Sequence, residues 1–236
     1  MRGTVGALAA LLCTLPGAAL AQAYQCRAPT APVSVPRVEP DGPFRRAPIT
    51  GYTLALSWSP EYCRGRERSA GDRFQCSGRR GRFGFVLHGL WPEGRGANWP
   101  QWCPAARPLT ARELSRNLCM TPSAELLATE WAKHGACMAR RPEDYFARAR
   151  TLWGGLRWPD FDRLSRREGL TASDIRQAFA DANPRWAPDG IGLVVNGRGW
   201  LREMRLCYER DFRPVRCDAR RLGPADSAPV RLWRGL

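Results

Sequence analysis

Three ionisable side chains of different kinds lie within five residues of one another near the middle of the chain. Glu130, Lys133 and His134 provide a carboxylate, an ammonium and an imidazole. The segment before them predicts a helix, which would place all three on one helix face, since Glu130 is three residues before Lys133 and four before His134. Lys133 is the only lysine among 37 basic residues, and His134 is one of only two histidines. This cluster therefore predicts a site of proton transfer rather than an ordinary surface ion pair.

The second histidine, His88, lies at the end of a predicted strand over residues 81–88. Gly89 follows it, which predicts a turn that leaves the imidazole at the edge of the strand. By itself His88 would more often be a half-buried structural histidine. Together with residues 130–134 it gives two imidazoles, a carboxylate and an ammonium. Such a set suits a reaction that needs a base, an acid and a positive charge to stabilise developing negative charge.

Cleavage of RNA is a reaction of this kind. A base removes the proton of the ribose 2′-OH, the oxygen attacks the adjacent phosphorus, and an acid protonates the 5′-oxygen as it leaves. Each proton transfer contributes roughly 10²–10⁴-fold to the rate. The net charge of +15 and the pI near 10.4 also favour a polyanionic partner, although nucleic acid, anionic lipid and acidic polysaccharide would all satisfy them.

Two segments of the chain resemble the active-site signatures of the ribonuclease T2 family, which are exported endoribonucleases that need no metal. These segments are His88-Gly89-Leu90-Trp91-Pro92 and Glu130-Trp131-Ala132-Lys133-His134-Gly135-Ala136-Cys137. Residues 56–63 and 200–207 resemble the first strand and a late strand of the family. The resemblance therefore covers the chain from residue 50 to residue 217.

The resemblance implies a role for each ionisable residue. His134 would be the general base on the 2′-OH and His88 the general acid for the leaving 5′-oxygen. The two would exchange roles when the 2′,3′-cyclic phosphate is hydrolysed. Lys133 and Glu130 would stabilise the pentacovalent phosphorus, Lys133 through its charge.

Three further positions would contact the substrate. Trp91 would hold it by stacking, and Glu93 occupies the place where family members often carry an acidic base-recognition residue. Stacking holds single-stranded bases with little regard to their identity, so we expect low base specificity. Thr129 stands where many members have a phosphate-binding histidine. Because threonine carries no charge, we expect slower hydrolysis of the cyclic phosphate to the 3′-phosphate.

The first 23 residues predict a secretory signal peptide, cleaved after Ala21 or Ala23. A membrane anchor is the less favoured alternative, because the apolar run is short and ends in small residues. No later stretch is apolar enough to cross a bilayer. We therefore expect an exported protein, periplasmic or extracellular, with no insertion into a membrane after cleavage.

Cysteine usage agrees with export. Cys13 would leave with the signal, and an even set of eight remains, which in an exported chain predicts disulfides but not their pairing. A zinc site is the competing use, but the chain has no closely spaced Cys pair and no histidine with a second ligand at metal spacing. We expect no metal and no cofactor. The resemblance implies the pairs Cys63–Cys76, Cys103–Cys137 and Cys207–Cys217, which leaves Cys26 with Cys119.

The order of the predicted elements favours an α+β fold, with a central antiparallel sheet and helices packed around it. Alternating residues predict strands over residues 52–58, 81–88, 191–195 and 200–207. Helical patterns cover residues 110–117, 123–134, 142–153 and 171–182. Around a catalytic domain of residues 49–218 we expect a loosely ordered Pro/Ala-rich leader, 24–48, and a frayed basic tail, 219–236.

The sequence thus predicts a monomeric endoribonuclease that cleaves single-stranded RNA through a cyclic phosphate. A non-catalytic protein that binds RNA or another polyanion is the main alternative, but it would not need both histidines, the glutamate and the lysine. A metal-dependent nuclease is the third. Trp99 and Trp102 are expected to pack within a loop rather than to contact substrate.

Overall fold

The computed structural model of the protein describes residues 23–105 and 107–234, with the backbone alone at residues 23 and 24. Residues 1–22 of the predicted signal peptide lie outside the described residues, so its cleavage stays a prediction. Within the part of the chain that is described, no helix is long and apolar enough to cross a membrane.

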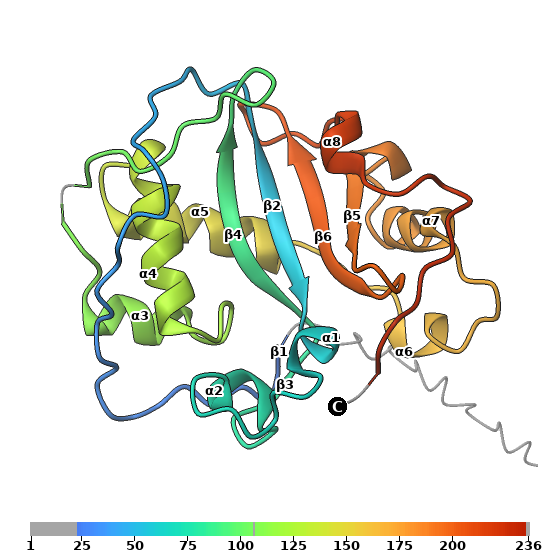
Figure 1. The fold of residues 1–236 in the computed structure, drawn as a ribbon, viewed down its shortest axis with the longest axis horizontal. Helices are drawn as coiled ribbons and strands as arrows, with labels where there is room; N and C mark the ends of the chain where they lie inside the picture. The colour runs from blue at the N-terminus through green and yellow to red at the C-terminus, as the bar shows by residue number, and fades with distance from the viewer. Residues whose placement is uncertain (1–22, 106, 235–236) are drawn as a thin grey trace, which may run out of the picture.

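An antiparallel sheet of four strands forms the centre of the fold, in the order β4, β2, β6, β5 (Figure 1). β4 is therefore an edge strand and β2 is central. The strands are β2 (Gly51–Trp58), β4 (Phe85–Glu93), β5 (Ile191–Val195) and β6 (Leu201–Tyr208). A separate short pair joins β1 (Ala23–Tyr24) to β3 (Arg82–Phe83).

One face of this sheet carries the apolar core. Leu54 and Leu56 of β2 are fully buried, and their partners on β4 are Leu90 and Leu87. Helix α5 passes behind these two strands in Figure 1, and its Tyr145 belongs to the same core. Burial of each such side chain contributes about 1.5–3 kcal/mol, so the pairing register of β2 and β4 is strongly fixed.

The four predicted helices are all present, and the α+β class with a central antiparallel sheet is confirmed. Helices α3 and α7 begin with capping boxes, because Thr110 and Thr171 each exchange hydrogen bonds with an acidic residue three positions later. The longer helices are α3 (Ala111–Asn117), α4 (Ala124–Lys133), α5 (Pro142–Gly154) and α7 (Ala172–Ala182). The short ones are α1 (Ser59–Cys63), α2 (Arg73–Cys76), α6 (Phe161–Leu164), α8 (Ala219–Leu222) and the 3-10 helices η1 (Gly135–Cys137) and η2 (Pro188–Gly190).

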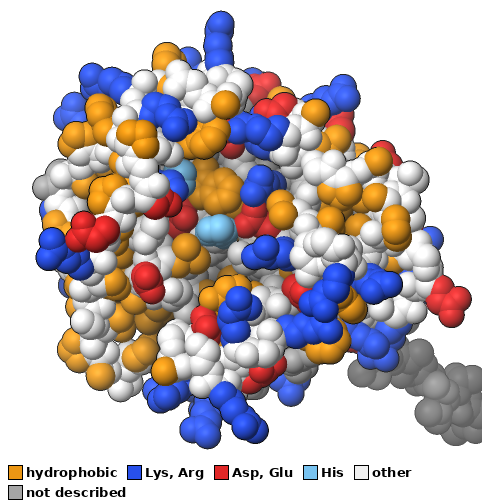
Figure 2. Space-filling model, in the orientation of Figure 1, with side chains coloured by type: hydrophobic (Ala, Val, Ile, Leu, Met, Phe, Trp, Pro, Cys, Tyr) orange, Lys and Arg blue, Asp and Glu red, His pale blue; other side chains and the backbone are white. Residues whose placement is uncertain are grey.

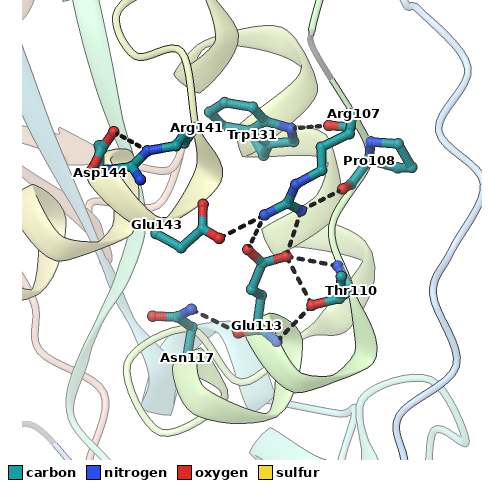
Figure 3. Close-up of polar contacts among 9 residues, drawn as sticks. All are labelled: Arg107, Pro108, Thr110, Glu113, Asn117, Trp131, Arg141, Glu143 and Asp144. Carbon is teal, nitrogen blue, oxygen red and sulfur yellow. Dashed lines mark hydrogen bonds and ion pairs between the residues drawn. The ribbon is translucent and has the colours of Figure 1, made fainter.

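A polar network joins α3, α4 and α5 (Figure 3). Arg107 donates two hydrogen bonds to Glu113 of α3, at 2.9 and 2.7 Å, and one of 2.7 Å to Glu143 of α5. The carbonyl of Arg107 accepts a 3.0 Å hydrogen bond from the indole of Trp131, on α4. Glu113 also accepts from the backbone N–H of Thr110. The network therefore holds α4 in place from two neighbouring helices.

Four disulfides bridge the described residues, of which three are the pairs that the resemblance implied and the fourth is the pair left by elimination. Cys103–Cys137 ties the loop after β4 to the 3-10 turn that follows α4, and Cys207–Cys217 ties β6 to the segment before α8. The other two are Cys63–Cys76 and Cys26–Cys119.

The segment 24–48 is held more tightly than expected from its composition. It contains no helix, but Cys26 is bonded to Cys119 and the backbone of Arg45 pairs with that of Gln101 in both directions. In Figure 1 it runs alongside α4 before entering β2. The leader is thus fixed near both of its ends.

The expectation of a frayed tail is wrong for the described residues up to 234. Residues 219–222 form α8, and Val230 and Leu232 are buried. The backbone N–H of Leu201, at the start of β6, donates to the carbonyl of Arg231. Two apolar side chains in alternation are enough to bury this segment against the sheet, although basic residues surround them.

Glu113→Gln is expected to lower the free energy of unfolding by about 1–3 kcal/mol at neutral pH, because a buried charged hydrogen-bond partner is lost. The hydrogen bonds from Arg107 hold the pKa of Glu113 at about 2, below its ordinary value of 4.5. The carboxylate therefore stabilises the fold fully above pH 4.5, and this contribution is lost as the pH falls towards 2.

Thermal unfolding of wild type and variant across this pH range checks the effect. The difference in melting temperature should narrow as the pH is lowered, whereas the exposed Glu168→Gln should change little at any pH. A difference that stays constant down to about pH 2.5 would contradict the account.

Candidate active site

His88 lies in a β-bulge of β4. Ala55 of β2 pairs with Gly89 and the next residue, Leu56, pairs with Leu87, so His88 has no partner on β2. The bulge arises because Leu87 and Leu90 must both face the core although they are three residues apart. The predicted turn at Gly89 is therefore wrong, since β4 continues to Glu93. A bulge redirects a side chain without ending the strand, and here it directs the imidazole out of the core.

The outer edge of β4 is fixed by groups from outside the sheet. The hydroxyl of Tyr145, on α5, donates to the carbonyl of Leu90 and accepts from its N–H, both at 3.2 Å. Leu87 is bonded in the same way, since its N–H donates to Met120 O at 2.9 Å and its carbonyl accepts from Thr121 Oγ1 at 2.8 Å. These bonds satisfy backbone groups on both sides of the bulge, which fixes the direction of His88.

Gly89 allows α4 to approach β4 closely. A Cβ atom at this position would overlap the carboxylate of Glu130 and would lie 2.6 Å from Trp91 Nε1. In the space left free, Trp91 Nε1 donates a 2.7 Å hydrogen bond to Glu130 Oε2. The absence of a side chain at Gly89 is thus what brings the two signature segments together.

The C-terminal end of α4 contributes the other ionisable groups. Ser123 caps the first turn of the helix by accepting from the N–H of Leu126. At the other end, the side chains of Glu130 and His134 are buried and that of Lys133 reaches the same pocket. The predicted grouping of these three residues on one helix face agrees with this arrangement.

The imidazole of His88 is held between two carboxylates. Its Nδ1 lies 2.7 Å from Glu203 Oε2, on β6, and its Nε2 lies 3.7 Å from Glu130 Oε1. Arg205 Nε donates in turn to Glu203 Oε1 at 2.7 Å. Glu203 and Arg205 were not among the predicted site residues, although their spacing of two residues on a predicted strand places them on one sheet face.

The net effect of these contacts and of burial is to raise the pKa values of both His88 and Glu130, which favours the charged form of the histidine and the neutral form of the carboxyl group. Burial acts to lower the pKa of His88, but the hydrogen bond to Glu203 and the charge of Glu130 outweigh it, so the pKa lies above 6.5. Burial raises the pKa of Glu130 to about 7, although His88 and the bond from Trp91 oppose the shift. His88 therefore favours its protonated form, and Glu130 can be neutral near pH 7.

His134 has the opposite character. Burial is the main cause that lowers its pKa to about 3, and the positive charges of Lys133 and His88 act in the same direction. Its Nδ1 is buried and has no hydrogen-bond partner among the described residues. The ring of His134 is thus a neutral imidazole over most of the pH range, with a free lone pair that can accept a proton.

Lys133 has a partner that sequence reasoning did not find. Its ammonium lies 2.7 Å from Asp41 Oδ2, in the leader, and Trp102 Nε1 donates to Asp41 Oδ1 at 3.0 Å. Asp41 is 62% exposed, so this ion pair contributes little to stability. It does place an exposed carboxylate at the edge of the pocket.

All seven predicted site residues line one pocket of about 460 Å³, and Figure 2 shows both histidines (pale blue) in a hollow on this face of the molecule. They are His88, Trp91, Glu93, Thr129, Glu130, Lys133 and His134. Their convergence does not by itself establish their roles. Within the described part of the chain, no cluster of three or more His, Cys, Asp or Glu side chains could hold a metal ion.

Trp91 lies at the centre of this group. The centre of its ring is 5.0 Å from that of His88 and 5.7 Å from that of His134, and its N–H is committed to Glu130. The guanidinium of Arg205 lies 5.4 Å from the same ring centre. Trp91 thus positions the ionisable groups in addition to any contact it makes with substrate.

The other end of the pocket surrounds Glu93. Its Oε1 accepts a 2.6 Å hydrogen bond from Thr53 and its Oε2 a 3.3 Å bond from Arg220 of α8. Arg220 also lies over the ring of Trp99, as Arg45 does. Trp99, for which only loop packing was expected, therefore lines the pocket. Arg220 was not predicted as a site residue, because residues 219–236 were expected to form a frayed tail.

The fold and this pocket define an α+β protein in which two histidines with opposite pKa shifts line one pocket. Residues 50–179 match the ribonuclease T2 family. A ribonuclease of Aeromonas hydrophila is 39% identical over 164 residues, which cover 68% of this chain and 72% of that protein. A probable ribonuclease of Haemophilus influenzae is 30% identical over 190 residues, which cover 76% of this chain and 65% of that protein, just under two thirds.

The structure of RNase NT in complex with 5′-AMP is similar in fold, with a TM-score of 0.60 at 20% identity, and the match covers 78% of this chain and 98% of that one. The chain belongs to the ribonuclease T2 family, which is a family of enzymes. The resemblance inferred from the two signature segments is confirmed.

Gly89→Ala is expected to reduce turnover at least 100-fold, because the added Cβ displaces the carboxylate of Glu130 from beside the imidazole of His88. Steady-state cleavage of RNA by the purified variant measures this effect. Gly71→Ala is the matched control, since a Cβ there meets no atom within 4 Å. Wild-type turnover by a folded Gly89→Ala protein would show that the close approach of β4 and α4 is not needed.

Proposed function

We propose that the protein is an endoribonuclease that cleaves single-stranded RNA by transphosphorylation to a 2′,3′-cyclic phosphate. One observation carries the proposal. Two histidines of opposite protonation tendency lie beside the Trp91 ring, with their ring centres 5.0 and 5.7 Å from its centre. A neutral and a protonated imidazole facing one pocket provide the base and the acid that the reaction needs.

In the first step, His134 accepts the proton of the ribose 2′-OH. Its lowered pKa keeps the ring in the neutral form, which a general base must have, at any pH above about 3. The 2′-oxygen attacks the adjacent phosphorus, and His88 donates its proton to the departing 5′-oxygen. The raised pKa of His88 keeps that proton available, and Glu203 stabilises the imidazolium.

Lys133 and Glu130 act on the pentacovalent phosphorus between these two proton transfers. The ammonium of Lys133 stabilises the negative charge that develops on the equatorial oxygens. Glu130, with a pKa of about 7, can hold a proton and donate a hydrogen bond to one of these oxygens. Substrate phosphate must compete with Asp41 for Lys133, and the exposure of Asp41 makes that displacement easy.

In the second step, water attacks the cyclic phosphate while the histidines exchange roles. His88 then removes a proton from the water and His134 returns one to the 2′-oxygen. Thr129, which lines the pocket beside them, can donate a hydrogen bond but adds no positive charge. We therefore propose that this step is slow and that the cyclic phosphate accumulates.

We propose low base specificity because the carboxylate of Glu93 is already engaged by other side chains. Both of its carboxylate oxygens already accept hydrogen bonds, from Thr53 and Arg220, so it has less capacity to select one base by its edge. Stacking on Trp91 is open to every base, because each has an aromatic face. We therefore propose that Trp91 contacts the substrate by stacking and that Glu93 contacts it without selecting one base.

We further propose that the protein is exported to the periplasm or the extracellular space and acts as a monomer. Four disulfides support an oxidising location. The catalytic domain would comprise residues 49–218. Residues 219–234 supply Arg220 and Arg221 to its pocket, so the functional unit extends past that boundary.

The purified protein is expected to cleave single-stranded RNA in the presence of a chelator. His88→Ala and His134→Ala should each lower the rate about 10²–10⁴-fold, because each removes one proton transfer. Product analysis on a series of dinucleotides should show 2′,3′-cyclic phosphates before 3′-phosphates. Cleavage that the chelator abolishes would instead indicate a metal-dependent nuclease, and RNA that is bound but stays intact would indicate a binding protein.

The pH profile of kcat/KM on a dinucleotide should be bell-shaped and broad. Activity should rise as His134 loses its proton, near pH 3, and fall above pH 6.5 as His88 loses its own. Glu203→Gln removes the negative charge beside His88 and should move the alkaline limb to lower pH. An alkaline limb that this variant leaves unmoved would contradict the assignment of His88 as the acid.

A further inference from the structure

A row of three paired residues crosses the sheet from Gly89 on β4 to Arg205 on β6. Gly89 of β4 pairs with Ala55 of β2, which pairs with Arg205 of β6. Paired residues on neighbouring strands point to the same face of a sheet. Because the first two have a hydrogen and a methyl group as side chains, the guanidinium of Arg205 has room to lie across the sheet towards β4.

The guanidinium ends at the centre of the site. It lies 5.4 Å from the centre of the Trp91 ring, which also has His88 and His134 beside it. Arg205 Nε is bonded to Glu203, and the two terminal nitrogens make no hydrogen bond with any described residue. The side chain is 29% exposed. Several N–H groups therefore point into the pocket without a protein acceptor, which is the arrangement that binds phosphate.

A second pocket, of about 680 Å³, adjoins the first. The two pockets share four lining residues, and these are His88, Leu126, Thr129 and Arg205. A phosphodiester joins two nucleosides, so a chain that enters both pockets crosses from one to the other at these residues. Arg205 is the only permanent cation among the four.

We propose that Arg205 is a phosphate-binding cation of this site, placed where the phosphate passes between the two pockets. The inference rests on the proposed ribonuclease function and deepens it. Thr129 leaves the boundary between the pockets without the positive charge that a phosphate requires. Arg205 supplies that charge from the opposite side, from β6 instead of α4.

Lys133 acts from the first pocket alone, whereas Arg205 lines both pockets and so lies at the boundary that the phosphate crosses. Arg205 is tied to Glu203 by Nε alone, which fixes the side chain and leaves the outer edge of the guanidinium for a ligand. A planar guanidinium can offer two parallel N–H groups to two phosphate oxygens.

Arg205→Gln is the first test, because glutamine can still donate a hydrogen bond to Glu203. KM for a dinucleotide and the inhibition constant of inorganic phosphate should each rise roughly tenfold or more, since a charge-assisted hydrogen bond is lost. Because the charge of Arg205 acts to lower the pKa of His88, the alkaline limb of the pH profile should move to higher pH. Arg198→Gln, in the exposed turn before β6, removes the same charge outside the site and should change neither constant.

The double variant Thr129→His, Arg205→Gln is the second test. Restoring a histidine at position 129 should recover most of the phosphate affinity lost in Arg205→Gln, whereas Thr129→His alone should gain much less. A histidine on α4 cannot reposition Glu203 on β6. Recovery is therefore expected only if Arg205 acts on the phosphate.

One set of results would contradict the proposed role of Arg205. A fall in kcat with unchanged inhibition by phosphate and no recovery by Thr129→His would overturn the proposal. Arg205 would then be a positioning residue that acts through Glu203 and His88. Binding of inorganic phosphate, measured by calorimetry on the same proteins, needs no turnover. It decides the role of Arg205 even if the wild-type protein fails to cleave RNA, which would overturn the proposed function alone.

Discussion

The site depends on one buried contact, in which the carboxylate of Glu130 lies against Gly89 and accepts the indole N–H of Trp91. A carboxylate is costly to bury, and one hydrogen bond offsets only part of that cost. The part of the cost that is not offset raises the pKa of Glu130. The charge of the carboxylate also acts to raise the pKa of His88. The packing of β4 against α4 thus sets the electrostatics of the site directly.

Burial lowers the pKa of both histidines, but their neighbours differ, so the net pKa shifts are opposite. His88 is buried with two carboxylates, Glu203 and Glu130, and is driven towards the charged form. His134 is buried beside Lys133 with no acceptor for its Nδ1, and is driven towards the neutral form. Two side chains with the same ordinary pKa thus acquire opposite protonation tendencies from burial and from their neighbours.

Much of the fold and the centre of the site could be predicted from the sequence, because local patterns specify them. The α4 cluster follows from i,i+3 and i,i+4 spacing, and capping residues mark the helices. The bulge at His88 was missed because Gly89 was interpreted as a turn, although leucines three residues apart in a strand already break the two-residue period. Arg220 and Asp41 were out of reach, since each is placed by contacts far along the chain that no local pattern records.

The family match covers the site residues that the sequence predicted, but not all of the residues that line the pocket. The four ionisable residues of the two signature segments, with Trp91, lie within residues 50–179, which match the family. Several charged groups around them come from outside that range: Asp41 from the leader, and Glu203, Arg205, Arg220 and Arg221 from β6 and α8. In the proposed function, Arg205 holds the phosphate and Arg220 limits how Glu93 meets a base. Both arginines reach the pocket because β6 and α8 fold onto it, so the proposed phosphate binding and base choice depend on long-range contacts as well as on the two signature segments.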